Sequence, residues 1–180
     1  MLKRLVERIR NHEQRAMSEL YQQYVGRLSS VCYRYVSDED DAKDVLQNSF
    51  VKIFTAIQNF EYRDEASFEG WMTKVVANEA LHFLRDRKRL IFTDLQVANA
   101  SQVVEEELAI ERITADELHQ LIGELPDGYR TVLNLYVFEN YSHRTIAELL
   151  GIKETTSATQ LYHAKQLLAR RIKELIDEER

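Results

Sequence analysis

SHRTIAELLGIKETTSATQLYHAKQLL, residues 142–168, gives the most specific indication of how the chain folds. Ser142 belongs to the residue types that accept a hydrogen bond at a helix N-terminus, and Gly151 follows a short amphipathic segment. Glycine there predicts a helix end, because it adopts the left-handed conformation without strain. A longer helix is expected from about Glu154 to Ile176. A short helix, a tight turn and a longer helix are typical of a helix-turn-helix, although a plain αα-hairpin has the same spacing.

The apolar residues of these two helices predict which side chains remain for a ligand. Ile146, Ala147 and Leu150 are expected to pack on Ile152, Leu161, Ala164 and Leu168. The polar side chains then expected to face outward are Thr155, Thr156, Thr159, Gln160 and His163. Such groups can donate to phosphates or reach base edges, and Gln160 could pair bidentately with an adenine. The pattern favours DNA binding in the major groove.

The rest of the chain also favours helices, which predicts an all-α protein. Its 180 residues include only five glycines and one proline, and 30% are charged. Helices are expected over about 2–10, 13–36, 38–57 and 68–88, the last two capped by Ser37 and Ser67. A capping box of Thr114 and Glu117 starts a further helix, and Pro126 breaks the chain before the next.

The periodicity weakens between Leu90 and Ile113, where Glu105, Glu106, Glu107 and Glu111 accumulate. We interpret residues 91–113 as an extended acidic linker, with a short solvated helix as the alternative. Two small helical domains are therefore predicted, residues 1–90 and 114–180.

Charge is unevenly distributed along a chain whose net charge is −6. Five acids between Asp38 and Asp44 accompany a single lysine, whereas four bases between Arg85 and Arg89 accompany a single acid. Two surfaces of opposite sign suggest two different partners.

The helix expected over 68–88 carries a polar stripe that ends in this basic cluster. Residues three or four apart lie on one helical face. The stripe consists of Lys74, Asn78, His82, Arg85 and Arg89. The basic cluster at its end also includes Arg87 and Lys88. The stripe suits a nucleic-acid strand held by charge and read by amide or imidazole groups, and a merely solvated face is the alternative.

Two segments before this helix add candidate contacts. The loop NFEYRDEAS carries Phe60 and Tyr62 beside Arg63, a combination on which an unpaired base can stack, although loop aromatics also simply cover cores. In the helix over 38–57, Val45, Leu46, Phe50, Ile53 and Phe54 can face inward. The polar face then carries Asp41, Asp44, Gln47 and Asn48. An acidic, amide-bearing face suits a basic helical protein better than DNA.

Several classes of protein are disfavoured. The five histidines lie in unrelated segments, so we expect no catalytic site, no metal site and no cofactor, and no small-molecule substrate. The single cysteine, Cys32, lies in an apolar helical pattern and is expected in the core. No apolar run approaches the roughly 18 residues of a membrane span, so we expect a cytoplasmic protein without membrane insertion.

Three segments, in this order, resemble the extracytoplasmic-function (ECF) sigma factors of RNA polymerase. DAKDVLQNSFVKIF, residues 41–54, resembles the family's core-polymerase-binding helix. FEGWMTKVVANEALHFLRDRKR, residues 68–89, resembles its helix for promoter melting and minus-ten recognition. LPDGYRTVLNLYVFENYSHRTIAELLGIKETTSATQLYHAKQLL, residues 125–168, resembles its minus-thirty-five-binding domain.

The resemblance implies a role for each segment. Asp44, Gln47 and Phe50 would dock the clamp helices of the largest polymerase subunit. Asn78, His82 and Arg85 would contact the minus-ten element, with Trp71 holding their helix and the loop 59–67 receiving an unstacked base. Residues expected at the minus-thirty-five DNA are Thr156, Thr159, Gln160 and Lys165, and the acidic linker would pass through polymerase channels. The family also implies an anti-sigma factor as a partner, besides core RNA polymerase and promoter DNA.

The sequence departs from the family at a few positions. The family commonly has Asp or Asn at His82, and often Lys or Arg at Ala158, Gln160 and His163. Fewer charges would therefore meet phosphate in the second domain. A stand-alone helix-turn-helix regulator is the alternative function, but it needs a ligand pocket or dimer face in residues 1–90, and the sequence indicates neither.

Overall fold

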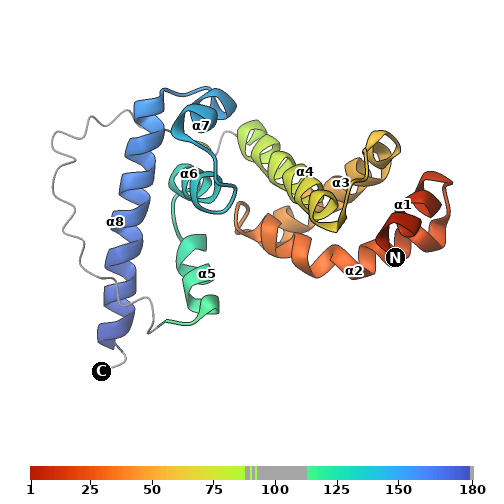
Figure 1. Cartoon of the computed structure of the whole chain (residues 1–180). Coiled ribbons are helices and arrows are strands. Elements are labelled where there is room, and N and C mark those ends of the chain that lie inside the picture. Colours follow the sequence, from red (N-terminus) through yellow and green to blue (C-terminus); the bar gives the residue numbers. More distant parts are fainter. Residues whose placement is uncertain (88–89, 91, 93–112, 179–180) are drawn as a thin grey trace. The chain divides into compact units, whose positions relative to one another are not determined.

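The computed structural model describes residues 1–87, 90, 92 and 113–178, and within them every regular element is a helix (Figure 1). The chain divides into two compact units, Met1–Arg87 and Lys88–Arg180, here called the N-terminal and C-terminal units. The all-α fold predicted from composition is confirmed. The predicted linker, apart from Phe92 and Ile113, falls outside the described residues, as do Lys88 and Arg89.

The N-terminal unit contains four α-helices and one short 3-10 helix. They are α1 (Leu2–Arg10), α2 (Gln14–Tyr33), α3 (Glu39–Ala56), η1 (Ile57–Asn59) and α4 (Glu65–Asp86). α2, α3 and α4 pack against one another, and α1 packs on α2 and η1. The core is formed by apolar side chains that these helices share, among them Ile9, Leu20, Leu28, Ile53, Phe68 and Met72. Burying such side chains is the main stabilisation of a unit this small.

The C-terminal unit is built around its last helix. It contains α5 (Ala115–Gly123), α6 (Asp127–Val137), α7 (His143–Leu150) and α8 (Glu154–Glu178), and α5, α6 and α7 all contact α8 (Figure 1). Val132, Leu135, Ile146 and Ala164 are almost completely buried in its core.

Most helix ends predicted in the C-terminal unit are confirmed. Thr114 Oγ1 accepts from Glu117 N at 3.2 Å and the Glu117 carboxylate accepts from Thr114 N at 2.6 Å, which completes the capping box of α5. Ser142 Oγ accepts from Thr145 N at 3.2 Å, and Gly151 has φ of 68° after α7.

Two caps in the N-terminal unit were predicted at the wrong residue. α3 is capped by Asp38 rather than Ser37, because the Asp38 carboxylate accepts from Asp41 N at 2.9 Å. α4 begins at Glu65 after Asp64, whose carboxylate accepts from Ser67 N at 2.7 Å. Ser67 is instead the third helical residue, and its hydroxyl accepts from Asp64 N at 3.2 Å. Both residue types cap helices, so the sequence alone favoured neither register. The second helix also ends earlier than expected, at Tyr33 rather than Val36.

Candidate nucleic-acid and protein interfaces

The polar stripe of α4 is exposed along the helix. Lys74, Asn78, His82 and Arg85 are all exposed, while Phe68, Met72, Val76, Ala80 and Leu84 of the opposite face are buried. His82 Nδ1 lies 3.1 Å from the Asp86 carboxylate, one turn further along. The four exposed residues are called the α4 stripe below.

Arg87, at the end of α4, has two neighbours in its own unit. Its guanidinium lies 3.7 Å from the Asp41 carboxylate and 5.0 Å from the centre of the Phe83 ring. Asp41 is only 16% exposed, so it is less available to a protein partner than predicted. The pair connects the start of α3 to the end of α4.

A groove of about 580 Å³ runs between α3 and α4, beside the α4 stripe. Lys52 and Glu79 form an ion pair across it. The other lining residues are the apolar Val51, Ala56 and Val75, the uncharged polar Thr55 and Asn78, and the basic His82 and Arg85. The apolar side chains match the faces of an unpaired base, the amide can bond to the edge of the base, and the basic side chains can bind its phosphate.

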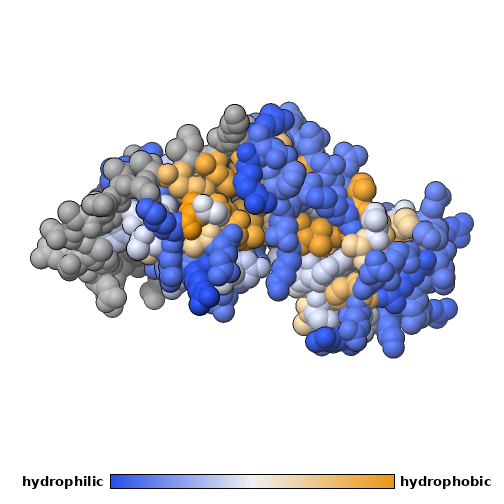
Figure 2. All heavy atoms as spheres, turned by 90° about the horizontal axis from the view of Figure 1, so that it is seen from above, coloured by the Kyte–Doolittle hydropathy of each residue, from blue (hydrophilic) through white to orange (hydrophobic). Residues whose placement is uncertain are grey.

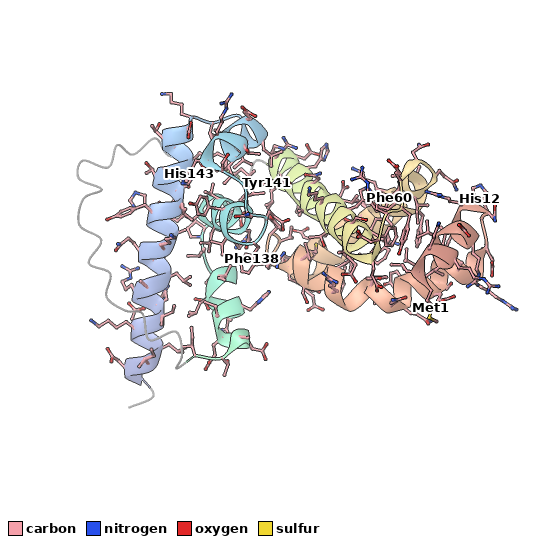
Figure 3. All side chains as sticks on the ribbon, viewed as in Figure 1. Met1, His12, Phe60, Phe138, Tyr141 and His143 are labelled. Atoms are coloured by element: carbon pink, nitrogen blue, oxygen red, sulfur yellow. The ribbon has the colours of Figure 1, made fainter. Side chains whose placement is uncertain are left out.

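The loop before α4 holds its aromatic rings against the core of the N-terminal unit. Phe60, labelled in Figure 3, stacks on Trp71 with ring centres 4.6 Å apart and meets the edge of Phe68 at 5.4 Å. Tyr62 lies 6.2 Å from the same Phe68 ring. Phe60 and Tyr62 are half-buried and Arg63 is exposed. Trp71 is therefore placed to hold this loop as well as α4.

The polar face of α3 is exposed at three of its predicted residues, Asp44, Gln47 and Asn48. We call these three the acidic–amide face. Phe50 is 4% exposed and packs against Tyr21, with ring centres 4.7 Å apart. The ring therefore belongs to the core, as the apolar pattern of this helix predicted, and its role in docking core polymerase stays a prediction. Tyr21 and Val51, 45% and 60% exposed, are nearby apolar side chains that the sequence did not single out.

The outward face of α8 differs from the predicted one. Thr155 and Lys165 are exposed, and Thr159 and His163 are half-buried. Thr156 and Gln160, however, are 5% and 1% exposed, so their predicted outward orientation is wrong. α8 packs against both α6 and α7, and this wider contact covers the row that ends in Ala164. The exposed side of α8 instead adds Gln166, with Tyr162 half-exposed beside it.

Polar contacts within the C-terminal unit fix the angle between its helices. His143, labelled in Figure 3, stacks on Tyr136 at 4.7 Å, and its Nδ1 lies 3.0 Å from Ser157 Oγ of α8. Burial lowers the pKa of His143, so its neutral form is favoured in this position. The neutral ring and the buried hydroxyl link the first helix of the helix-turn-helix to the second.

The described residues contain no group of three or more His, Cys, Asp or Glu side chains placed to hold a metal ion. Cys32 is buried, and burial raises the pKa of its thiol to about 12. The thiol is therefore protonated at neutral pH and belongs to the core, as predicted. Among the described helices, none has the length and apolar character needed to cross a membrane.

The sequence of the chain matches two models of the sigma-70 family in succession. Sigma-70 region 2 matches residues 20–90, and sigma-70 region 4 matches residues 115–168. The first match runs from Leu20, within α2, past the end of α4, and the second includes the helix-turn-helix. An all-helical chain with these two regions in this order defines a sigma-70 type subunit.

Curated relatives agree over almost the whole chain. The ECF RNA polymerase sigma factor SigW of Bacillus subtilis is 24% identical over 97% of this chain and 98% of its own length. The RNA polymerase sigma-H factor of Pseudomonas aeruginosa is 28% identical over 97% and 95%. SigV of Bacillus subtilis is 28% identical over 77% and 80%. The chain belongs to the ECF sigma factors, which recognise promoters for RNA polymerase and regulate transcription initiation rather than catalyse a reaction.

Proposed function

We propose that the N-terminal unit melts and holds the minus-ten element through the α4 stripe and the groove between α3 and α4. The observation that supports this most strongly is the exposure of Asn78, His82 and Arg85 along one wall of that groove, with Lys74 exposed on the same helix. Arg87, followed in the sequence by Lys88 and Arg89, would add positive charge for binding the DNA backbone. Cations bind the backbone of either DNA form, whereas a groove of apolar walls accepts only an unpaired base.

Base capture is the proposed source of promoter melting. A protein that binds unpaired DNA better than duplex shifts the equilibrium toward the melted state by the difference in binding free energy. The loop from Asn59 to Ser67, with Phe60, Tyr62 and Arg63, borders α4 and would receive the unstacked base. Phe60 already stacks on Trp71, so Tyr62 and the groove wall are the surfaces left for that base.

The acidic–amide face of α3 is the proposed contact with core RNA polymerase. Asp44, Gln47 and Asn48 are exposed. They belong to α3 and carry no positive charge, unlike the α4 stripe. Carboxylates do not bind phosphate, so this face suits a basic protein helix instead. The exposed side chain of Tyr21 would add apolar area to that contact.

The C-terminal unit is proposed to bind the minus-thirty-five element with α8 in the major groove. Its corrected outward face offers Thr155, Thr159, Tyr162, Lys165 and Gln166 for phosphates and base edges. Gln160 and Thr156 would then act through the packing of α8 on α6 and α7. His163 stacks near Tyr129, at 5.8 Å, and is a secondary candidate.

A cytoplasmic location and control by an anti-sigma factor complete the proposal. An inhibitor would have to cover the acidic–amide face, the α4 stripe or both. Hydrophilic side chains cover most of the face shown in Figure 2, with apolar groups emerging in small patches. In the C-terminal unit, three consecutive large side chains, Tyr136, Val137 and Phe138, are 38%, 52% and 43% exposed.

In vitro transcription tests the proposal directly. Purified chain is added to purified core polymerase with a library of promoter fragments, and transcript start sites are sequenced. New start sites preceded by shared minus-ten and minus-thirty-five sequences are expected. Core polymerase that starts at the same sites with and without the chain would contradict the proposed function.

A further inference from the structure

Arg10, in the last turn of α1, binds the backbone at both ends of η1. Its Nε donates to the carbonyl oxygen of Ile57 at 3.1 Å, and its guanidinium also donates to the carbonyl oxygen of Phe60. In return, Gln58 Nε2 donates to the carbonyl oxygen of Arg10 at 3.1 Å. Arg10 itself lies outside residues 20–90, which match the region 2 model.

A guanidinium is well suited to this position because it is planar, always charged and presents several donors in a fixed fork. Phe60 N also donates to Ile57 O, at 3.3 Å, so the turn from Ile57 to Phe60 is closed on itself. Two carbonyls bound by one rigid group leave the backbone of this turn few alternative conformations. The path by which the chain enters the loop 59–67 is fixed as a result.

α1 provides a rigid base for this contact. Leu2, Leu5, Val6 and Ile9 are 6%, 4%, 1% and 0% exposed, so the apolar face of the helix is fully packed. The ring of Phe60, which begins the loop, then stacks on Trp71 of α4. α1 and α4 thus hold the start of the loop from two sides.

We propose that Arg10 is a positioning residue that pre-organises the loop 59–67, here called the base-capture loop, for the unpaired minus-ten base. The inference rests on the proposed function of the loop. Without Arg10, the loop would sample more conformations, and the cost of ordering it would fall on the binding of the base. Contacts made elsewhere by the chain, to core polymerase or to the minus-thirty-five element, would not change.

The test uses the full chain bound to core polymerase. First, 2-aminopurine placed along the non-template strand of the minus-ten element locates the captured base by its rise in fluorescence on melting. Promoters with each of the four bases at that position are then compared for the rate of open-complex formation. For Arg10→Ala, we expect a loss on the order of tenfold on the preferred promoter and discrimination among the four bases reduced toward none.

Two further variants separate positioning from a general structural effect. Arg4→Ala removes the same charged group from an exposed position of the same helix and should behave as the parent. Arg10→Lys keeps the charge but not the fork, so it should recover only part of the discrimination. Core affinity, measured by fluorescence anisotropy, should be equal in all variants.

The outcomes distinguish the inference from the function it depends on. A parent that does not discriminate among the four bases overturns base capture by the loop, and the role of Arg10 with it. A parent that discriminates while Arg10→Ala keeps the same ratios overturns the role of Arg10 alone. The same holds if Arg10→Ala slows all four promoters by one common factor, since that pattern indicates lost stability.

Discussion

Arg130 is a buried cation that binds groups at the end of α5 and at the start of its own helix, α6. Its guanidinium donates to the carbonyl oxygens of Gly123 at 2.6 Å and Leu125 at 2.8 Å, and it pairs with Asp127. The side chain is 3% exposed, so its loss would leave these acceptors without a donor in a dry environment. Arg130→Ala should lower the free energy of unfolding of the C-terminal unit by about 2–4 kcal/mol, as measured in urea.

Arg144→Ala is the matched control for that prediction. Arg144 lies in the same unit, pairs with Glu148 at 3.3 Å, and has a side chain that is 81% exposed. Exposed ion pairs contribute little, so the expected change is below about 0.5 kcal/mol. Equal effects of the two substitutions would show that the burial of Arg130 does not matter to stability.

For single residues, the sequence shows whether a side chain is polar but not whether it is buried. Thr156 and Gln160 were predicted to face outward because polar side chains usually do, yet α6 and α7 together cover them. Arg10 was not singled out at all. Its bonds to Ile57 and Phe60 join residues that are far apart in the chain, and no local pattern marks such a contact.

At the scale of elements, amphipathic periodicity located every α-helix of the described residues and most of the helix faces. Each α-helix described in the structure corresponds to a predicted one, because apolar residues three and four apart must be buried on one side. The remaining errors concern ends, where Ser37 competes with Asp38 and Ser67 with Asp64. Side-chain oxygens at either position can cap, and the choice depends on how the preceding loop packs.

The face of α3 supports a prediction about core polymerase. Replacing Asp44 and Gln47 together with Ala should weaken core binding at least tenfold, because exposed groups at a charged interface contribute mainly to partner recognition. Thermal unfolding should change little, since neither side chain is buried. Core affinity is measured by anisotropy of labelled chain.

The control for α3 uses another exposed acid and amide. Asp116 and Gln120 lie on α5 and are also exposed. Their double replacement should leave core affinity near the parental value. Loss of binding in this pair, or parental binding in the α3 pair, would assign the contact to a different surface.

For the whole molecule, the distribution of charge matters more than its sum. The net charge of −6 would oppose DNA binding if it were spread evenly, but the α4 stripe places Lys74 and Arg85 on one exposed face of α4. Replacing Lys74 and Arg85 with Ala should make promoter binding by the holoenzyme less dependent on salt. The slope of log affinity against log salt should fall by about 0.7 for each cation lost, if both contact single-stranded phosphate.

Lys3 and Arg4 provide the control with the same change in net charge. Both are exposed on α1 and lie outside the proposed DNA surface. Their replacement should leave the salt dependence unchanged. An equal fall in slope for the two double variants would mean that net charge, rather than the α4 stripe, determines binding.

The two units have separate cores, which predicts that they unfold separately. Ile53 in α3 and Ile146 in α7 are both 0% exposed, each among side chains of its own unit. Ile→Ala at a buried site costs about 2–5 kcal/mol through lost burial and the cavity left behind. Native-state hydrogen exchange should show Ile53→Ala lowering protection only in α1 to α4, and Ile146→Ala only in α5 to α8. If either variant lowers protection equally in both units, the two units unfold as one cooperative body. The two promoter elements would then be bound by that single body rather than by two independent modules.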